Sequence, residues 1–309
     1  MDGKKNKSHA SEFTRAVKKD WDLYLMLFFP FCLLVLFKYI PMGGLIMAFQ
    51  DFDIFEGFFH SPMVGFANFQ ELFSQKEFLS VLLNTLSISW YKILFFFPLP
   101  IALALALNEV RCGWFKRTVQ TIVYLPHFLS WVVVAGLAFD MLSSTGTVNL
   151  ILSALGMKTV NFLMEPSMFQ PIVVVSAIWK EVGYSAIVYL AAISAIDPTL
   201  YEAAVMDGAG KWKQLLNVTL PGIVPMIVMM LLLRVGTVMD ANVEQIMAMY
   251  NPTVYSTGDV IGTYIYRIGL GNMQYSLAAA AGLFNSVVSF TLVFFCNLAS
   301  KKVVHRSLW

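Results

Sequence analysis

The sequence predicts an all-α membrane protein with six transmembrane helices. Of its 309 residues, 58% are hydrophobic and only 13% are charged, whereas a soluble domain carries about 25% charged residues. Six apolar segments approach or exceed the roughly 20 residues that a helix needs to cross the hydrocarbon core of a bilayer. Because so much apolar surface needs lipid as its solvent, the composition excludes a soluble protein.

The six predicted spans cover residues 23–39, 81–107, 118–139, 169–196, 220–239 and 277–300. A polar, basic segment of 20 residues precedes the first span, and Tyr39-Ile40-Pro41 follows it where a signal peptide would have a small-residue cleavage site. We therefore expect the first span to be a retained anchor. We also expect it to wrap the other five spans from outside. The second and fourth spans are long enough to tilt in the bilayer.

Lys and Arg residues are concentrated in alternate connecting segments. The N-terminal tail holds six, the 109–117 loop three, the 197–219 loop two and the C-terminal tail three. The other three loops hold one each: Lys76, Lys158 and Arg267. Since basic residues are retained on the cytoplasmic side, both termini and the 197–219 loop should be cytoplasmic.

The first outer segment, residues 42–79, combines acidic residues with many Phe side chains. It fits two interpretations, an interfacial aromatic belt or a docking surface for an external partner.

The polar side chains indicate neither catalysis nor a metal site. The three cysteines show no metal-ligand spacing and no disulfide framework, and the four histidines are scattered. A net charge of +2 does not indicate a nucleic-acid partner. The run Gly208-Ala209-Gly210-Lys211 resembles a phosphate-binding loop, but positions 205 and 212 do not fit that motif. We therefore expect no catalytic residue, no metal and no bound ATP in this chain.

The 197–221 loop is the most informative segment. Asp197 can cap a helix that Pro198 begins, and the glycines at 208 and 210 should end that helix. A second short helix is predicted over residues 211–218, before Leu220-Pro221 opens the next span. Two short helices around a glycine turn fit a lever that inserts into a groove of another protein.

The spacing within this loop resembles the EAA motif of ABC-importer permeases, E-A-A-x3-G-x9-I-x-L-P. Glu202, Ala203, Ala204, Gly208, Leu220 and Pro221 match it, and Val218 stands in place of Ile. Four further segments resemble the LplB-like oligosaccharide and polysaccharide permease branch of the carbohydrate-uptake class. These are 37–42 (FKYIPM), 124–131 (YLPHFLSW), 178–183 (IWKEVG) and 282–286 (GLFNS).

The resemblance implies a type I ABC importer transmembrane domain in the inner membrane of a bacterium. In that family the loop couples to an ATPase subunit dimer. The resemblance therefore assigns a role in ATPase coupling to Glu202, Ala203, Ala204, Asp207, Gly208, Leu220 and Pro221. It also implies a second homologous permease subunit, an extracytoplasmic solute-binding protein, and ATP with Mg held by the ATPase subunits. The permease core should span residues 78–300. Residues 1–77 should form the cytoplasmic N-terminal tail, the first span and the outer loop, and residues 301–309 the cytoplasmic C-terminal tail.

Charged and aromatic residues within the spans are candidates for a solute path. A charged side chain facing lipid costs roughly 2.5–3.5 kcal/mol on insertion scales, so such residues must face protein, water or a partner. Candidates for a sugar path are Trp179, Tyr184, Asn285, Lys92 and Arg234. For Lys92 and Arg234 we favour a role as struts between helices. Lys180 and Glu181 are adjacent on a helix, and we expect them not to pair.

Three alternative functions remain open on the sequence. The same importer architecture could carry a peptide, a lipid or glycerol phosphate in place of a sugar. A secondary carrier driven by an ion gradient is disfavoured by the EAA loop. A membrane enzyme would need a cluster of acid, base or metal-binding residues, which the spans lack.

Overall fold

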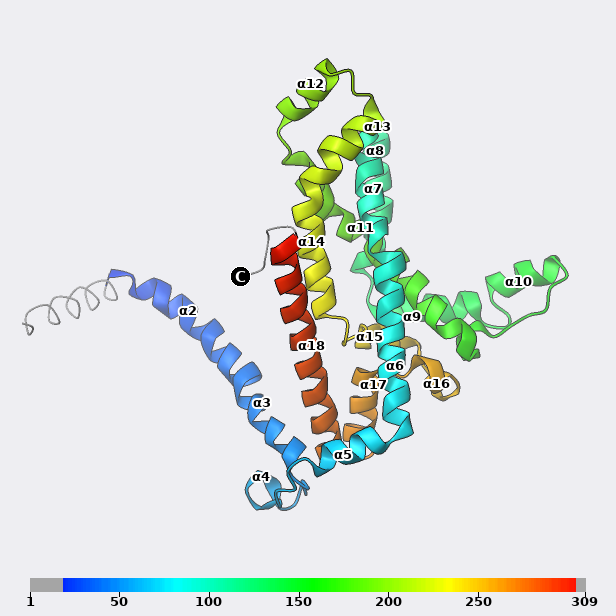
Figure 1. Ribbon diagram of the computed structural model, residues 1–309. Helices are drawn as coiled ribbons and strands as arrows, with labels where there is room; N and C mark the ends of the chain where they lie inside the picture. The colour runs from blue at the N-terminus through cyan, green and yellow to red at the C-terminus, as the bar shows by residue number, and fades with distance from the viewer. Residues whose placement is uncertain (1–18, 304–309) are drawn as a thin grey trace, which may run out of the picture.

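The computed structural model describes residues 19–303 and consists of helices joined by short loops (Figure 1). No β-sheet forms in this part of the chain, where one isolated bridge pairs Gln50 with Met63. The first half contains α2 (Trp21–Leu34), α3 (Ile40–Met42), α4 (Gly57–His60), α5 (Ala67–Ser74), α6 (Lys76–Tyr91), α7 (Pro98–Glu109), α8 (Gly113–Tyr124), α9 (Trp131–Leu142) and α10 (Thr147–Ala154). The second half contains α11 (Pro166–Ser194), α12 (Pro198–Met206), α13 (Lys211–Gln214), α14 (Leu220–Gly236), α15 (Val243–Met249), α16 (Tyr255–Gly258), α17 (Ile261–Tyr266) and α18 (Tyr275–Val303).

Short π and 3-10 turns join several of these helices into longer rods. The π turns are η1 (Val35–Tyr39), η3 (Lys92–Phe96), η6 (Leu215–Thr219) and η8 (Arg267–Gly271). The 3-10 turns are η2 (Gly43–Phe49), η4 (Leu125–Phe128), η5 (Phe162–Met164) and η7 (Pro252–Val254).

Six helical segments among residues 19–303 are long and apolar enough to cross a membrane, as predicted. They are Trp21–Phe49, Lys76–Glu109, Trp131–Ala154, Pro166–Ser194, Lys211–Gly236 and Tyr275–Lys302. The second, fourth and sixth lie within a few residues of the predicted ends. The first runs ten residues further than predicted because α3 and η2 continue it.

The third span was predicted in the wrong place. Residues 118–139 do not form one helix, because α8 ends at Tyr124 and the 3-10 turn η4 follows. Pro126 lies in that turn, and the Ser130 side chain then accepts a hydrogen bond from the Val133 backbone N–H, which caps a new helix. The membrane-length segment therefore begins at Trp131 and includes α10.

The fifth span also starts earlier than predicted. Residues 211–218 are not a separate helix, since α13, η6 and α14 form one continuous rod of 26 residues. Pro221 lacks a backbone N–H and would clash with the carbonyl four residues before it in a regular helix. The π turn η6 lies at that place, where the Leu220 N–H reaches the Leu215 carbonyl.

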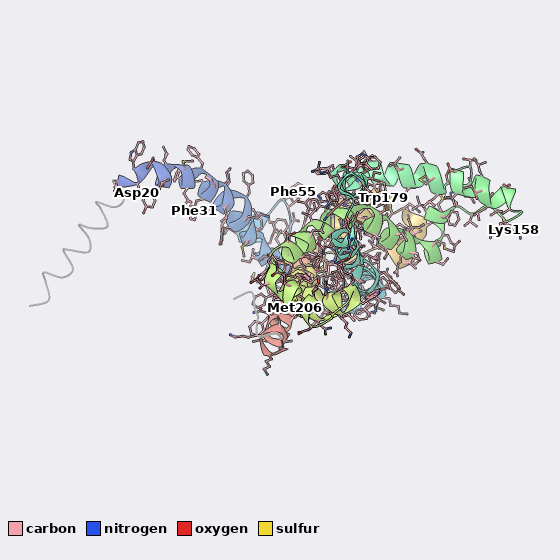
Figure 2. The ribbon with its side chains drawn as sticks, turned by 90° about the horizontal axis from the view of Figure 1, so that it is seen from above. Asp20, Phe31, Phe55, Lys158, Trp179 and Met206 are labelled. Carbon is pink, nitrogen blue, oxygen red and sulfur yellow. The ribbon has the colours of Figure 1, made fainter. Side chains whose placement is uncertain are left out.

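The first span stands apart from the rest of the chain. None of the side chains of α2 is buried, and Figure 1 shows α2 leaning away from α18 and α14. Only its end, η2, packs against α18. Seen from above (Figure 2), Asp20 and Phe31 lie along this arm, and Lys158 marks a second arm on the opposite side. The prediction that this span wraps the core of its own chain is wrong.

Three clusters of buried side chains hold the bundle together. One joins α5, α6, α17 and α18, a second joins α6, α9, α11 and α15, and a third joins α7, α11 and α14. The helix α11 contributes to two of them and also packs against α8. It is therefore the central helix of the fold, and Ala241 in the loop after α14 belongs to the cluster that packs on it.

Candidate functional site

The loop that carries the EAA motif folds as a short helix, a glycine turn and a return into the membrane rod. The Thr199 backbone N–H donates to Asp197 Oδ1 at 2.9 Å, and this hydrogen bond lowers the pKa of the Asp197 carboxyl. An ionised Asp197 therefore caps α12. At the other end Gly208 has a φ of +72°, and the Ala209 N–H donates to the Ala204 carbonyl at 2.8 Å. The predicted helix and glycine stop are both confirmed.

The tip of this loop exposes apolar side chains. Leu200, Val205 and Met206 are 53%, 59% and 87% exposed. Figure 1 places α12 at one end of the molecule, and α4 and α5 at the opposite end. Of the predicted coupling residues, Glu202, Ala203, Asp207, Gly208 and Pro221 are exposed, while Ala204 and Leu220 are half-buried.

Two hydrogen bonds fix the loop to the membrane rod. The Tyr201 hydroxyl lies 2.9 Å from Thr219 Oγ1, and Gln214 Nε2 donates to the Ala209 carbonyl at 2.8 Å. Thr219 and Gln214 belong to the rod that ends in α14, so these two hydrogen bonds join α12 and its glycine turn to the fifth span. The geometry suits a lever.

Lys92 is held by a buried network in the bundle. Its side chain is 2% exposed, and Nζ donates to the Ala241 carbonyl at 2.9 Å and to Gln245 Oε1 at 2.7 Å. Gln245 Nε2 donates in turn to the Val173 carbonyl and to Ser176 Oγ of α11. The network links the second span, α15 and α11. These contacts favour the interpretation of Lys92 as a strut between helices.

Arg234 differs from Lys92. It is half-buried near the end of α14, with its guanidinium 5.1 Å from the centre of the Phe96 ring. Within residues 19–303 its side chain makes no hydrogen bond or salt bridge. It lines a cavity of about 310 Å³ together with Lys92 and a second cavity of about 320 Å³ together with Tyr184. The structure therefore brings three of the five predicted path residues together.

Trp179 and Asn285 lie elsewhere. Trp179 is 49% exposed and lines a separate, apolar cavity between α9 and α11. Asn285 belongs to α18, and its Oδ1 atom is buried without a hydrogen-bond partner in the described part of the chain. Neither residue shares a cavity with Arg234.

An ionic cluster lies where η4 meets α11, and it corrects the expectation that Lys180 and Glu181 do not pair. Lys180 Nζ is 3.0 Å from Glu181 Oε1. His127 supplies the reason, because its Nδ1 lies 2.7 Å from Glu181 Oε2 and its carbonyl accepts from Lys180 Nζ at 2.7 Å. Lys180 and Glu181 therefore meet because both contact His127. Lys180 also lies over the Trp131 ring, 5.2 Å from its centre.

Tyr184 closes this cluster on one side. Its ring stacks on His127 with centroids 3.8 Å apart and planes 2° from parallel. One aromatic face is therefore occupied, although the side chain remains 45% exposed. Sequence reasoning missed this cluster because His127 and Glu181 are 54 residues apart. A usable signal was that the two segments 124–131 and 178–183, which both resemble the permease branch, each carry polar residues within an apolar run.

A metal centre finds no support in the residues that the structure describes. No group of three or more His, Cys, Asp and Glu side chains in that part of the chain could hold an ion.

Comparison with known proteins agrees with the motif. The family described as "Binding-protein-dependent transport system inner membrane component" matches residues 96–305. The polygalacturonan/rhamnogalacturonan transport system permease protein YteP of Bacillus subtilis (strain 168) is 43% identical, covering 93% of this chain and 90% of that protein. The protein LplB of the same organism is 39% identical, and the match covers 95% of this chain and 93% of that protein.

Two solved structures share the fold. A bacterial ABC transporter involved in the import of the acidic polysaccharide alginate contains a chain 46% identical to this one, with a TM-score of 0.88. The match covers 94% of this chain and 99% of that one. A bacterial alginate ABC transporter in complex with an alginate pentasaccharide-bound periplasmic protein also matches, with a TM-score of 0.88 and 45% identity. This match covers 95% of this chain and 99% of that one.

The family match extends over about two thirds of the chain, and the relatives match nearly all of it. The predicted resemblance to sugar-importer permeases is confirmed, together with the inner membrane as the location. The chain belongs to the family of binding-protein-dependent transport system inner membrane components.

Proposed function

We propose that this chain is the permease subunit of an ABC importer that translocates an oligosaccharide delivered by an extracytoplasmic binding protein. The observation that carries the proposal is the EAA loop, whose exposed helix α12 is tied by hydrogen bonds to the fifth span. Relatives named for polygalacturonan and rhamnogalacturonan transport and for alginate import support the sugar class.

ATP hydrolysis is assigned to partner subunits. In this proposal an ATPase dimer holds ATP and Mg and receives α12 in a groove, where the apolar tip at Leu200, Val205 and Met206 becomes buried. Glu202 makes a charged contact with that subunit. The movement then passes through Thr219 and Gln214 into α14.

The transport path needs a second, homologous permease subunit. The apolar side chains of α2 are exposed on all sides, so lipid or another subunit must cover them. The loop at α12 faces the cytoplasm, as do both termini in the orientation that the Lys and Arg distribution predicts. The outer loops face the binding protein.

The test is uptake by the reconstituted importer. The chain is purified with its partner permease and ATPase, placed in proteoliposomes, and supplied with the binding protein and radiolabelled oligosaccharides of uronates and of neutral sugars. We expect ATP-dependent uptake of at least one oligosaccharide, with hydrolysis stimulated by the loaded binding protein. Uptake of glycerol phosphate or a peptide, with no oligosaccharide transported, would contradict the sugar class.

A further inference from the structure

Arg234 has no fixed partner among the described residues, unlike the other cations that face the bundle. Lys92 donates to two oxygens, Lys180 pairs with Glu181, and Arg267 contacts Asp259 at 2.5 Å and Glu77 at 2.8 Å. A guanidinium carries five N–H donors in a planar fork. None of these donors on Arg234 is used within residues 19–303, and none of its nitrogens is both buried and unsatisfied. The donors therefore open into the cavities that Arg234 lines.

The cavity shared with Lys92 is lined by polar groups. Ser89, Thr237 and Asn242 add hydrogen-bonding groups to its lining. The backbone of Ala241 and Asn242 lies in the left-handed region, with φ of 49° and 60°, a conformation that non-glycine residues adopt only where the surroundings enforce it. This conformation holds the Ala241 carbonyl on Lys92.

The guanidinium of Arg234 brings a positive charge to this cavity that no carboxylate pairs in the described residues. Lys92 and Arg234 face one carboxylate, Asp240, which is exposed and forms no salt bridge in the described residues. Glu181 lies close enough for its charge to act on Arg234, but both of its oxygens already engage His127 and Lys180. The cavity can therefore accept a further negative charge.

The second cavity adds aromatic surface beside the same guanidinium. Phe96 and Tyr184 line it with Arg234, and Phe96 lies against the cation. Aromatic faces bind the apolar faces of sugar rings, and a small number of placed polar groups fix orientation. Arg234 thus lies between a polar, cationic cavity and an aromatic one.

We propose that Arg234 binds the carboxylate of an acidic sugar during translocation, which makes the permease itself selective for uronate-containing oligosaccharides. The inference rests on the proposed function as an oligosaccharide importer. A guanidinium matches a carboxylate through two parallel, charge-assisted hydrogen bonds. A permanent carboxylate partner would occupy the fork, whereas a substrate carboxylate occupies it only in passage.

The experiment uses the complete importer in proteoliposomes, with the three cysteines of this chain replaced by serine. Its probe is radiolabelled trigalacturonate. We expect Arg234→Gln to lower the uptake rate about tenfold, equivalent to about 1.4 kcal/mol, while the thermal midpoint of the purified complex stays unchanged. Arg234→Lys should retain more uptake than Arg234→Gln because it keeps the charge without the fork.

Chemical restoration of the charge separates a path residue from a strut. In Arg234→Cys, aminoethyl methanethiosulfonate adds a cation to the thiol and sulfonatoethyl methanethiosulfonate adds an anion. The first reagent should restore trigalacturonate uptake and the second should not. Equal restoration by both reagents would overturn the proposal because the sign of the charge would not matter, and failure of both to react would overturn it because the position would not be open to the path. A loss of complex stability in Arg234→Gln and Arg234→Lys alike would also overturn it and would point to a carboxylate of the partner subunit.

The wild-type complex separates this inference from the proposed function. If it transports neutral trisaccharides and excludes trigalacturonate, the inference fails and the importer assignment stands. If it transports no oligosaccharide of either kind, the proposed function fails.

Discussion

His127 Nδ1 lies 2.7 Å from Glu181 Oε2, which fastens the 3-10 turn η4 to the centre of α11. The same carboxylate receives Lys180 through its other oxygen. Glu181 therefore joins the break between α8 and α9 to the central helix of the fold, and it neutralises a lysine whose side chain is only 6% exposed.

Replacing Glu181 by glutamine should destabilise the protein. The amide cannot neutralise Lys180, and losing hydrogen bonds to charged groups costs about 2 kcal/mol. We expect Glu181→Gln to lower the thermal midpoint of the purified complex. Glu71→Gln is the matched control, because Glu71 is exposed and its carboxylate makes no hydrogen bond or salt bridge in the described residues. Equal midpoints for the two variants would show that the cluster adds nothing to stability.

Gly183 permits a close approach between α11 and α8. A Cβ at this position would overlap the Val123 backbone carbonyl, which cannot move without displacing the end of α8. Gly183→Ala should therefore cost at least the 1–3 kcal/mol typical of overpacking and reduce the yield of folded protein. Gly136→Ala in α9 meets no atom within 4 Å and should be neutral or stabilising, since alanine favours helix.

Lys92 should act as a strut. Lys92→Gln shortens the side chain and removes the hydrogen bonds that join η3 to Ala241 and Gln245. We expect a loss of about 2 kcal/mol in stability and an equal fall in transport for every solute. Lys158→Gln, at an exposed position, is the control. A stable Lys92→Gln complex that loses only acidic sugars would instead place Lys92 in the solute path.

The glycine turn after α12 should be required for coupling. Gly208 has a φ of +72°, which a β-branched residue adopts at a cost of about 1–2 kcal/mol, so Gly208→Val should distort the tip of the lever. Gly210→Ala is the control, because φ there is −69° and open space surrounds the glycine. We expect Gly208→Val, and Ala204→Trp beside it, to raise the ATP hydrolysed per solute transported. Wild-type ratios in both would contradict the lever.

Much of the fold could be predicted because membrane helices are encoded locally. The capping by Asp197 and the stop at Gly208 follow from neighbouring residues, and both appear as expected. The break at Pro126 was missed because the apolar run continues across it, and hydropathy does not register a 3-10 turn. The pairing of Lys180 with Glu181 depends on His127, a contact between elements that no local pattern contains.

The candidate site was predicted unevenly for the same reason. The coupling loop lies within 25 consecutive residues and has a fixed spacing, so its residues could be named from the sequence. The path residues come from four different helices. Composition marked Lys92 and Arg234 as equivalent, and only the packing distinguishes a lysine held by Ala241 and Gln245 from an arginine with free donors.

The most direct test of the account is the contact between α12 and the ATPase. Met206 is 87% exposed at the tip of α12, so Met206→Cys in a cysteine-free chain can report which side and which subunit it faces. We predict that an impermeant thiol reagent labels it only from the cytoplasm, that added ATPase protects it, and that it cross-links to a cysteine in the ATPase groove. A cysteine at Lys158 should be labelled only from outside. Outside labelling of Met206→Cys, or no protection by the ATPase, would contradict the assignment of this loop as the coupling element.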